Sequence, residues 1–171
     1  MTRQLILLAS VLALGACANT GTLGPRAAAP LQSTTGNTAT GAVTFVQSGD
    51  KVKVSGVVTG LKANTEHGFH VHEKGDCSSG DGMSAGGHFN PHAKMHAAPA
   101  TPDRHAGDMP MLVADATGVA TLTAELDVIT IGGATDIVGK GLIVHKDPDD
   151  FKTQPTGNSG ARLACGVIKA K

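Results

Sequence analysis

Histidine is concentrated in one short part of this chain of 171 residues. Six of the eight histidines lie between positions 70 and 108. Five of them, together with one aspartate, form a pattern of potential ligands: His70, His72, His88, His96, His105 and Asp108. Imidazole nitrogen is the commonest metal ligand among side chains, and it suits both copper and zinc. The run therefore predicts two metal sites built side by side.

His70 and His72 are two residues apart on a predicted strand, so both imidazoles should leave the same face. A lone His-x-His pair is more often two exposed strand residues, but the neighbouring histidines favour a metal site. His145 ends another predicted strand. By itself it would be structural, and it becomes a candidate ligand only if its strand lies beside that of His70.

The other potential ligands lie in a segment without a strand or helix period: His88, His96, His105 and Asp108. Three imidazoles and one carboxylate make a closed tetrahedral set for zinc. The alternative is a polar loop with scattered histidines, which the scarcity of histidine elsewhere disfavours. Spacing alone assigns His88 to zinc only. His67 and His92 add nothing that either site needs, and we expect both at the surface.

Short alternating segments predict the elements that carry these residues. The expected strands cover 38–47, 51–58, 66–73, 111–114, 118–126, 137–145 and 162–169, with the first two and then 111–114 and 118–126 forming hairpins. Short strands without a long helical period indicate an antiparallel sandwich or barrel. Segments 73–108 and 146–161 are long loops, and loops of such length are usually functional. With 14 basic and 14 acidic residues, nothing indicates a nucleic-acid partner.

The N-terminus has the features of an export signal. Arg3 precedes an apolar run over 5–14, and Leu14-Gly15-Ala16-Cys17 resembles the lipobox of bacterial lipoproteins. We predict a lipoprotein signal peptide over 1–17 with lipidation at Cys17; the alternative is ordinary cleavage after Ala18. Cysteine arithmetic favours lipidation, because one disulfide leaves one of three cysteines over. Residues 18–37 have few large apolar side chains, which predicts a flexible tether before a domain over 38–171.

Five motifs follow one another in a fixed order: Gly68-Phe69-His70-Val71-His72, Ala85-Gly86-Gly87-His88-Phe89-Asn90-Pro91, His105-Ala106-Gly107-Asp108, Val144-His145-Lys146-Asp147-Pro148-Asp149-Asp150 and Gly160-Ala161-Arg162-Leu163-Ala164-Cys165-Gly166-Val167-Ile168. Together they resemble the bacterial copper/zinc superoxide dismutases of the lipoprotein type. The resemblance covers about residues 38–170.

The resemblance implies a Greek-key β-sandwich, or flattened barrel, with long metal-binding and electrostatic loops. It assigns His88 to both metals, as a bridging imidazole and catalytic residue. It implies that Asp149 hydrogen-bonds His70 and His96, that Arg162 guides the anionic substrate, and that Cys77 and Cys165 form a disulfide. The implied copper ligands are His70, His72, His88 and His145, and the implied zinc ligands are His88, His96, His105 and Asp108.

The implied reaction converts superoxide to dioxygen and hydrogen peroxide at copper, with zinc in a structural site. The enzyme would lie in the periplasm, where its N-terminal lipid holds it to a membrane. There it would protect the cell envelope from superoxide. Ala18 after Cys17 favours the outer membrane. A monomer and a homodimer both stay open. A catalytically silent copper-binding relative and a structural envelope sandwich are the rivals, and the presence of His88, His145 and Arg162 disfavours both.

Overall fold

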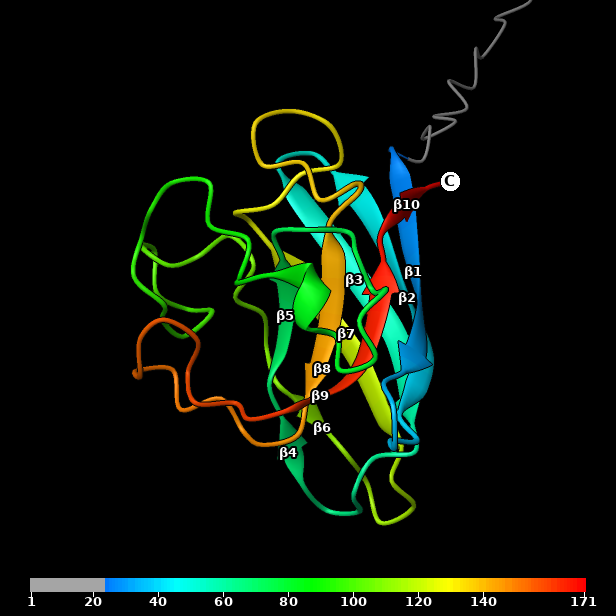
Figure 1. The fold of residues 1–171 in the computed structure, drawn as a ribbon. Coiled ribbons are helices and arrows are strands. Elements are labelled where there is room, and N and C mark those ends of the chain that lie inside the picture. The colour runs from blue at the N-terminus through cyan, green and yellow to red at the C-terminus, as the bar shows by residue number, and fades with distance from the viewer. Residues whose placement is uncertain (1–23) are drawn as a thin grey trace, which may run out of the picture.

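The fold is built almost entirely from antiparallel strands. A computed structural model describes residues 24–171, so the predicted signal peptide and Cys17 lie outside the described residues. One sheet curls into a half-barrel, with long loops gathered on one side of it (Figure 1). This confirms the predicted all-β fold. No helix within residues 24–171 is long and apolar enough to cross a membrane.

The strand order of the large sheet is β5-β8-β9-β1-β2-β3-β7, with β10 pairing β1, and a small sheet pairs β4 with β6. After β6 the chain crosses back to place β7 beside β3, and β8 then pairs with β5, which gives a Greek-key path. The strands are β1 Arg26–Ser33, β2 Thr40–Ser48, β3 Lys51–Thr59, β4 Glu66–His67, β5 Phe69–His72, β6 Leu112–Val113, β7 Ala120–Leu126, β8 Gly141–His145, β9 Arg162–Val167 and β10 Lys169–Ala170.

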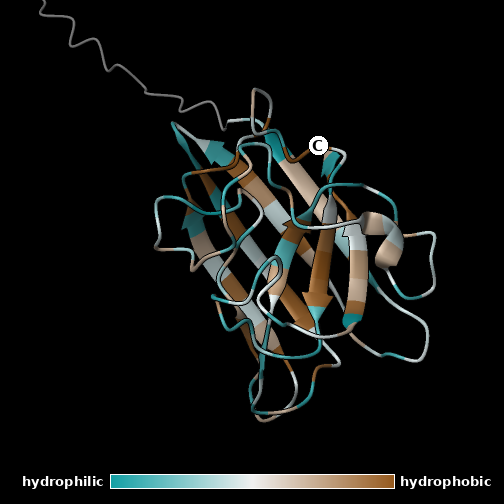
Figure 2. Ribbon diagram, turned by 60° about the vertical axis from the view of Figure 1, so that its left-hand side comes forward, coloured by the Kyte–Doolittle hydropathy of each residue, from teal (hydrophilic) through white to brown (hydrophobic). Residues whose placement is uncertain are grey.

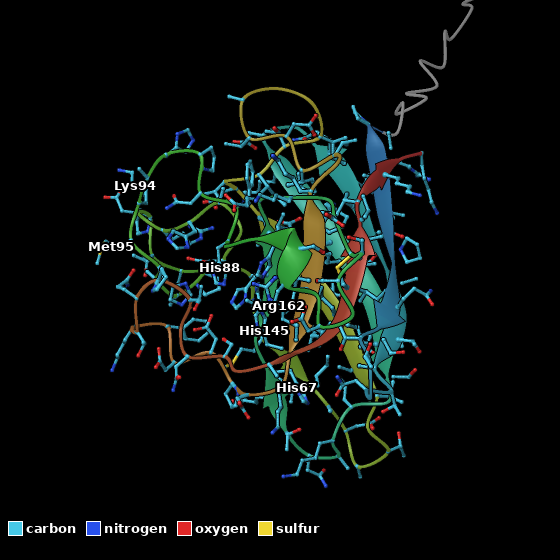
Figure 3. The ribbon with its side chains drawn as sticks, in the orientation of Figure 1. His67, His88, Lys94, Met95, His145 and Arg162 are labelled. Carbon is cyan, nitrogen blue, oxygen red and sulfur yellow. A yellow bond between two sulfur atoms is a disulfide. The ribbon has the colours of Figure 1, made fainter. Side chains whose placement is uncertain are left out.

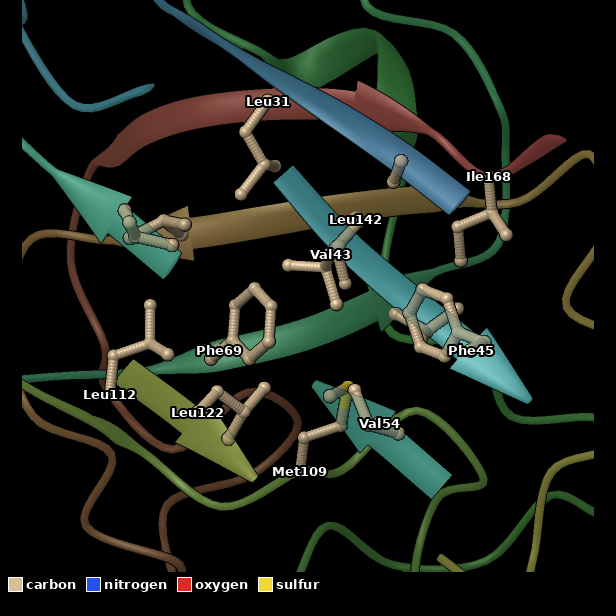
Figure 4. Packing of buried hydrophobic residues seen from close by; sticks show 14 of the residues in the cluster. Leu31, Val43, Phe45, Val54, Phe69, Met109, Leu112, Leu122, Leu142 and Ile168 are labelled. Carbon is tan, nitrogen blue, oxygen red and sulfur yellow. The ribbon is translucent and has the colours of Figure 1, made fainter. Parts of the chain in front are cut away.

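Side chains alternate between core and solvent along most of these strands. In β3, Val52 and Val54 are buried, whereas Lys51 and Lys53 are exposed. Figure 2 shows the same banding of hydropathy along the ribbon. This is the period of two that a half-buried strand requires. The inward side chains form one core, in which Phe45, Phe69, Leu142 and Ile168 take part (Figure 4).

The first predicted hairpin is confirmed, and the second is wrong. β2 and β3 pair from Thr40 opposite Thr59 to Ser48 opposite Lys51. The turn after β6 does form, because Asp115 Oδ1 accepts bonds from the backbone N–H groups of Thr117 and Val119. The strands beside that turn nevertheless diverge, since β6 pairs with β4 and β7 pairs with β3.

Gly68 divides the predicted strand over 66–73 into β4 and β5. Its N–H donates to the carbonyl of Asp147, and Ser159 packs so closely that a Cβ would not fit there. β5 then pairs with β8, with Phe69 opposite Val144 and His70 opposite Ile143. The strand that ends in His145 therefore lies beside the strand that carries His70.

The predicted tether over 18–37 is wrong for residues 26–33, and the fold begins before residue 38. These residues form β1, which pairs with β2 along most of its length and with β9 at its end. Ala27 and Ala29 are fully buried and Leu31 is 1% exposed. The composition of this segment did not indicate a strand, because most of its inward residues are alanines. Alanine is small and only weakly hydrophobic, so it does not mark a core segment as a large apolar residue does.

Replacing Leu31 by alanine tests whether β1 is part of the domain. Leu31 lies in the core beside Val43 and Leu142 (Figure 4). We expect Leu31→Ala to lower the free energy of unfolding by about 2–5 kcal/mol, the usual effect of truncating a buried leucine. Urea unfolding measures this, with exposed Gln32→Ala as the control. Equal stability of the two variants would contradict the assignment of β1 to the core.

Candidate metal centre

The long loop after β5 turns back along the free edge of that strand. The backbone N–H of Val71 donates to Gly107, and that of Phe89 donates to Val71. Isolated β-bridges join His70 to Asp108 and His72 to His88. β5 is therefore held between β8 on one side and the loop on the other, which carries loop side chains to the histidines of the strand.

Two groups of buried side chains result, and they share one member. The first contains His70, His72, His88 and His145, and the second contains His88, His96, His105 and Asp108. Within each group the potential ligand atoms lie within 4.8 Å of one another. His88 comes from the loop, and His145 comes from the end of β8 (Figure 3). The structure thus brings together all seven residues that the resemblance names as ligands.

In the first group, the tautomers of His72 and His145 leave the lone pairs of their Nε2 atoms facing one another. His72 Nδ1 lies 2.9 Å from the carbonyl oxygen of Gly86, and His145 Nδ1 lies 3.4 Å from that of Gly160. A carbonyl oxygen only accepts, so both Nδ1 atoms carry the proton. The two Nε2 atoms are then unprotonated in neutral rings, yet they lie 3.3 Å apart. Two such lone pairs repel unless a cation lies between them.

Two further nitrogens in the group are buried without any hydrogen-bond partner. They are His70 Nδ1 and His88 Nε2. Buried polar atoms are nearly always satisfied, so an orphaned nitrogen indicates a missing partner. Four imidazole nitrogens that converge in this way fit a copper ion, for which imidazole is a suitable ligand.

The second group converges on one carboxylate oxygen. Asp108 Oδ1 lies 2.9 Å from His88 Nδ1, 3.0 Å from His96 Nδ1 and 3.4 Å from His105 Nδ1. The other oxygen of Asp108 accepts the backbone N–H groups of Ala97 and His105, which fixes its orientation. Three imidazoles and one carboxylate, all buried, fit a closed tetrahedral zinc site.

Asp149 joins the two groups from the side opposite the ligand atoms. Its Oδ2 lies 2.7 Å from His70 Nε2 and its Oδ1 lies 2.9 Å from His96 Nε2. Both Nε2 atoms therefore carry protons, so Nδ1 is the nitrogen of each ring that faces the ligand groups. A carboxylate behind a ligand histidine fixes tautomer and ring orientation in this way.

Burial and carboxylates divide the histidines into two electrostatic classes. Burial, reinforced by neighbouring imidazoles, holds the pKa of His72 and His145 well below the usual value. Burial also lowers the pKa of His70, and that of His88 to about 4, although bonds to Asp149 and Asp108 partly oppose this. These four rings are neutral near pH 7, as metal ligands must be.

His96 behaves differently because two carboxylates contact it. Burial alone would lower its pKa, but its bonds to Asp108 and Asp149 outweigh burial and raise the pKa to about 9. Burial would likewise raise the pKa of both aspartates. Hydrogen bonds from His105, His88 and His96 instead hold the pKa of Asp108 below its usual range, and bonds from His70 and His96 do the same for Asp149. The proton on His96 supplies, beside Asp108, the positive charge that a bound zinc ion would otherwise supply.

Arg162 lies at the start of β9, opposite His145 in the strand register (Figure 3). Its two terminal nitrogens donate to the carbonyls of Gly82 at 2.7 Å and Gly86 at 2.6 Å. The Gly86 oxygen also accepts from His72, so one carbonyl positions both the guanidinium and a histidine of the first group. Burial lowers the pKa of Arg162, but a guanidinium remains charged at neutral pH.

The predicted disulfide is present. Cys77 and Cys165 are bonded across a sequence separation of 88 residues, which ties the loop to β9 three residues after Arg162. Closing a loop of that length stabilises the fold by about 4–5 kcal/mol in the chain-entropy model.

Two predictions about the remaining histidines have opposite outcomes. His92 is exposed, as expected. The expectation for His67 is wrong, because it is only 2% exposed. Its Nδ1 bonds the carbonyl of His145 and its Nε2 bonds Thr65 Oγ1. His67 has the same strand parity as the core residues Phe69 and Val71, and β4 is covered by its pairing with β6, so its ring is buried.

Sequence reasoning missed the backbone and buried partners of the site. The carbonyl of Gly86 has no sequence signal beyond the glycine pair. Arg104 precedes His105 and is buried, with one nitrogen 2.8 Å from Asp127 and its Nε without a partner. It ties the loop to the end of β7, and nothing in its sequence neighbourhood indicates this.

Comparisons with known proteins agree with this geometry. A family model described as copper/zinc superoxide dismutase (SODC) matches residues 39–168. The extracellular Cu-Zn superoxide dismutase of Haemonchus contortus is 42% identical over 134 residues, which cover 75% of this chain and 72% of that protein. Its counterpart in Caenorhabditis elegans is 40% identical over 134 residues, covering 75% of this chain and 60% of that protein.

A solved structure resembles the whole described fold. The crystal structure of the clock protein EA4 superposes with a TM-score of 0.78 at 41% identity, covering 86% of this chain and 96% of that chain. The family model spans most of the sequence, and the same span carries both groups of buried ligands. The chain therefore belongs to the copper/zinc superoxide dismutase family.

Proposed function

We propose that the two groups of buried side chains are the copper and zinc sites of this superoxide dismutase. His70, His72, His88 and His145 hold copper. The zinc ligands are His88, His96, His105 and Asp108. The observation that carries the proposal is the position of His88, whose Nδ1 belongs to the zinc group while its Nε2 is buried without a partner. One imidazole that presents both nitrogens in this way is suited to bridge two ions.

A bound copper ion supplies the one-electron exchange by which two superoxide anions and two protons become dioxygen and hydrogen peroxide, while the closed zinc site holds the loop. The protein supplies a proton carrier and an anion guide. His88 Nε2 is the unpartnered atom that can take up and return a proton. Arg162 places a fixed positive charge beside His145, and such a charge draws small anions to a site and raises their association rate.

Replacing His145 by alanine tests the copper assignment. Loss of one imidazole removes a nitrogen that lies 3.3 Å from His72 Nε2. Mutation of a residue that hydrogen-bonds to a metal ligand typically lowers activity about 10- to 100-fold. We therefore expect removal of a ligand itself to reduce superoxide dismutation by more than about 100-fold. The rate is measured on protein loaded with copper and zinc.

Exposed His92→Ala is the matched control, because it removes the same side chain outside both groups. It should dismutate superoxide as the parent does. An inactive loaded parent, or a His145→Ala variant as active as the His92→Ala variant, would contradict the proposed function.

We also propose that the protein is a bacterial lipoprotein of the envelope, attached through Cys17 to the outer membrane, where it removes superoxide. The lipobox-like Leu14-Gly15-Ala16-Cys17 supports lipidation. Export agrees with the Cys77–Cys165 disulfide, since disulfides persist in oxidising compartments. Mass spectrometry of the mature N-terminus should find a lipid-modified Cys17. An unmodified chain beginning at Asn19, as cleavage after Ala18 would give, would contradict the anchor.

A further inference from the structure

The side chain of Gln154 makes a reciprocal pair of hydrogen bonds with the backbone of His96. Gln154 Oε1 accepts the N–H of His96 at 2.8 Å, and Gln154 Nε2 donates to the carbonyl of His96 at 2.8 Å. The two residues are 58 positions apart. A side-chain amide thus bonds both polar groups of one backbone residue, as a neighbouring strand would.

Besides Gln154, the backbone at His96 is tied only through the next N–H, that of Ala97, which donates to Asp108 Oδ2 at 3.1 Å. Residues 93–98 belong to no strand or helix. In the described chain, no further hydrogen bond reaches the N–H or the carbonyl of His96.

The other members of the zinc group are held differently. His88 and Asp108 are bridged to β5 through the backbone, and His105 bonds neighbouring Asp108 through both its N–H and its carbonyl. His96 is therefore the member of that group whose N–H and carbonyl are both bonded by one side chain of another loop.

The loop that carries Gln154 also holds the ring of His96. Asp149 lies in the same loop and contacts His96 Nε2. The loop is closed by bonds from Asp150 N–H to the carbonyl of Gly157 at 3.0 Å and from Gly157 N–H to that of Thr153 at 2.7 Å. Gly157 has φ +68°, and a Cβ there would meet both the Asp149 carboxylate and the His96 ring. His96 is thus held at its ring by Asp149 and at its backbone by Gln154.

We propose that Gln154 is a positioning residue of the zinc site, which fixes His96 so that its Nδ1 faces Asp108. This inference rests on the proposed assignment of His96 to zinc. The bond to Asp149 orients the ring but does not fix the distance from His96 Nδ1 to Asp108. If the backbone of His96 were free, the ring could move away from Asp108 while keeping that bond. Bonds at two points remove that freedom, and both come from a loop that ends beside Arg162.

Zinc binding to the metal-free protein tests the proposal. Zinc is titrated in competition with a chromophoric chelator, after circular dichroism has established that each variant is folded. We expect Gln154→Ala to weaken zinc binding about 10- to 100-fold, the usual effect of removing a partner of a metal ligand. Gln154→Glu keeps the acceptor for the His96 N–H and loses the donor, so it should weaken binding less. It also serves if the alanine variant does not fold.

Gln47→Ala is the matched control. Gln47 bonds three backbone groups outside both loops, those of Gly49, Lys51 and Ile131. Gln47→Ala also removes an amide that bonds backbone groups, but it does so away from the zinc group. It should therefore leave zinc affinity unchanged even if it lowers stability. Cobalt(II) in place of zinc supplies a second measurement. The visible absorption bands of bound cobalt should change in the Gln154 variants and not in Gln47→Ala.

Parent-like zinc affinity and cobalt spectra in both Gln154 variants would overturn the proposal. His96→Ala separates this failure from failure of the zinc assignment itself. If His96→Ala loses zinc while the Gln154 variants keep it, His96 is a ligand and only the role of Gln154 is refuted. If His96→Ala also binds zinc as the parent does, both the assignment and the role of Gln154 are refuted.

Discussion

The metal centre depends on unprotonated nitrogens that are buried close to one another. Carbonyls behind His72 and His145 and a carboxylate behind His70 and His96 decide which nitrogen of each ring carries the proton. The remaining lone pairs face inward, where burial excludes water and keeps most of the rings neutral. Such an arrangement is unfavourable without a cation and favourable with one, which agrees with the proposed binding of two metal ions.

The sheet and the loops contribute different parts of this arrangement. β5 and β8 supply three histidines on rigid backbone, and their pairing sets the spacing of the proposed copper ligands. The loops supply the proposed zinc ligands and are held at several points along β5 and β9. Asp149 joins the two groups, the disulfide and the Arg162 bonds anchor the loop after β5, and Gln154 bonds the His96 backbone. Order in the loops and order in the metal centre therefore depend on each other.

Local patterns in the sequence predicted the parts of this design that are local. Two-residue spacing placed His70 and His72 together, and the ligand types of the loop indicated zinc. The neighbour relation of His145 could not be predicted from spacing, because it requires pairing between strands about 70 residues apart. The double role of His88 came from family resemblance. Burial of His67 and the strand formed by 26–33 were missed, since His67 was judged only by what the metal sites need and inward alanines do not look like a core.

The central claim is that two ions share His88, and anomalous scattering tests it most directly. A crystal grown with both metals is measured at the copper and zinc absorption edges. The account predicts one copper peak beside His70, His72, His88 and His145, and one zinc peak beside His88, His96, His105 and Asp108, with a ring nitrogen of His88 facing each. A single peak, or two ions with no common histidine, would contradict it.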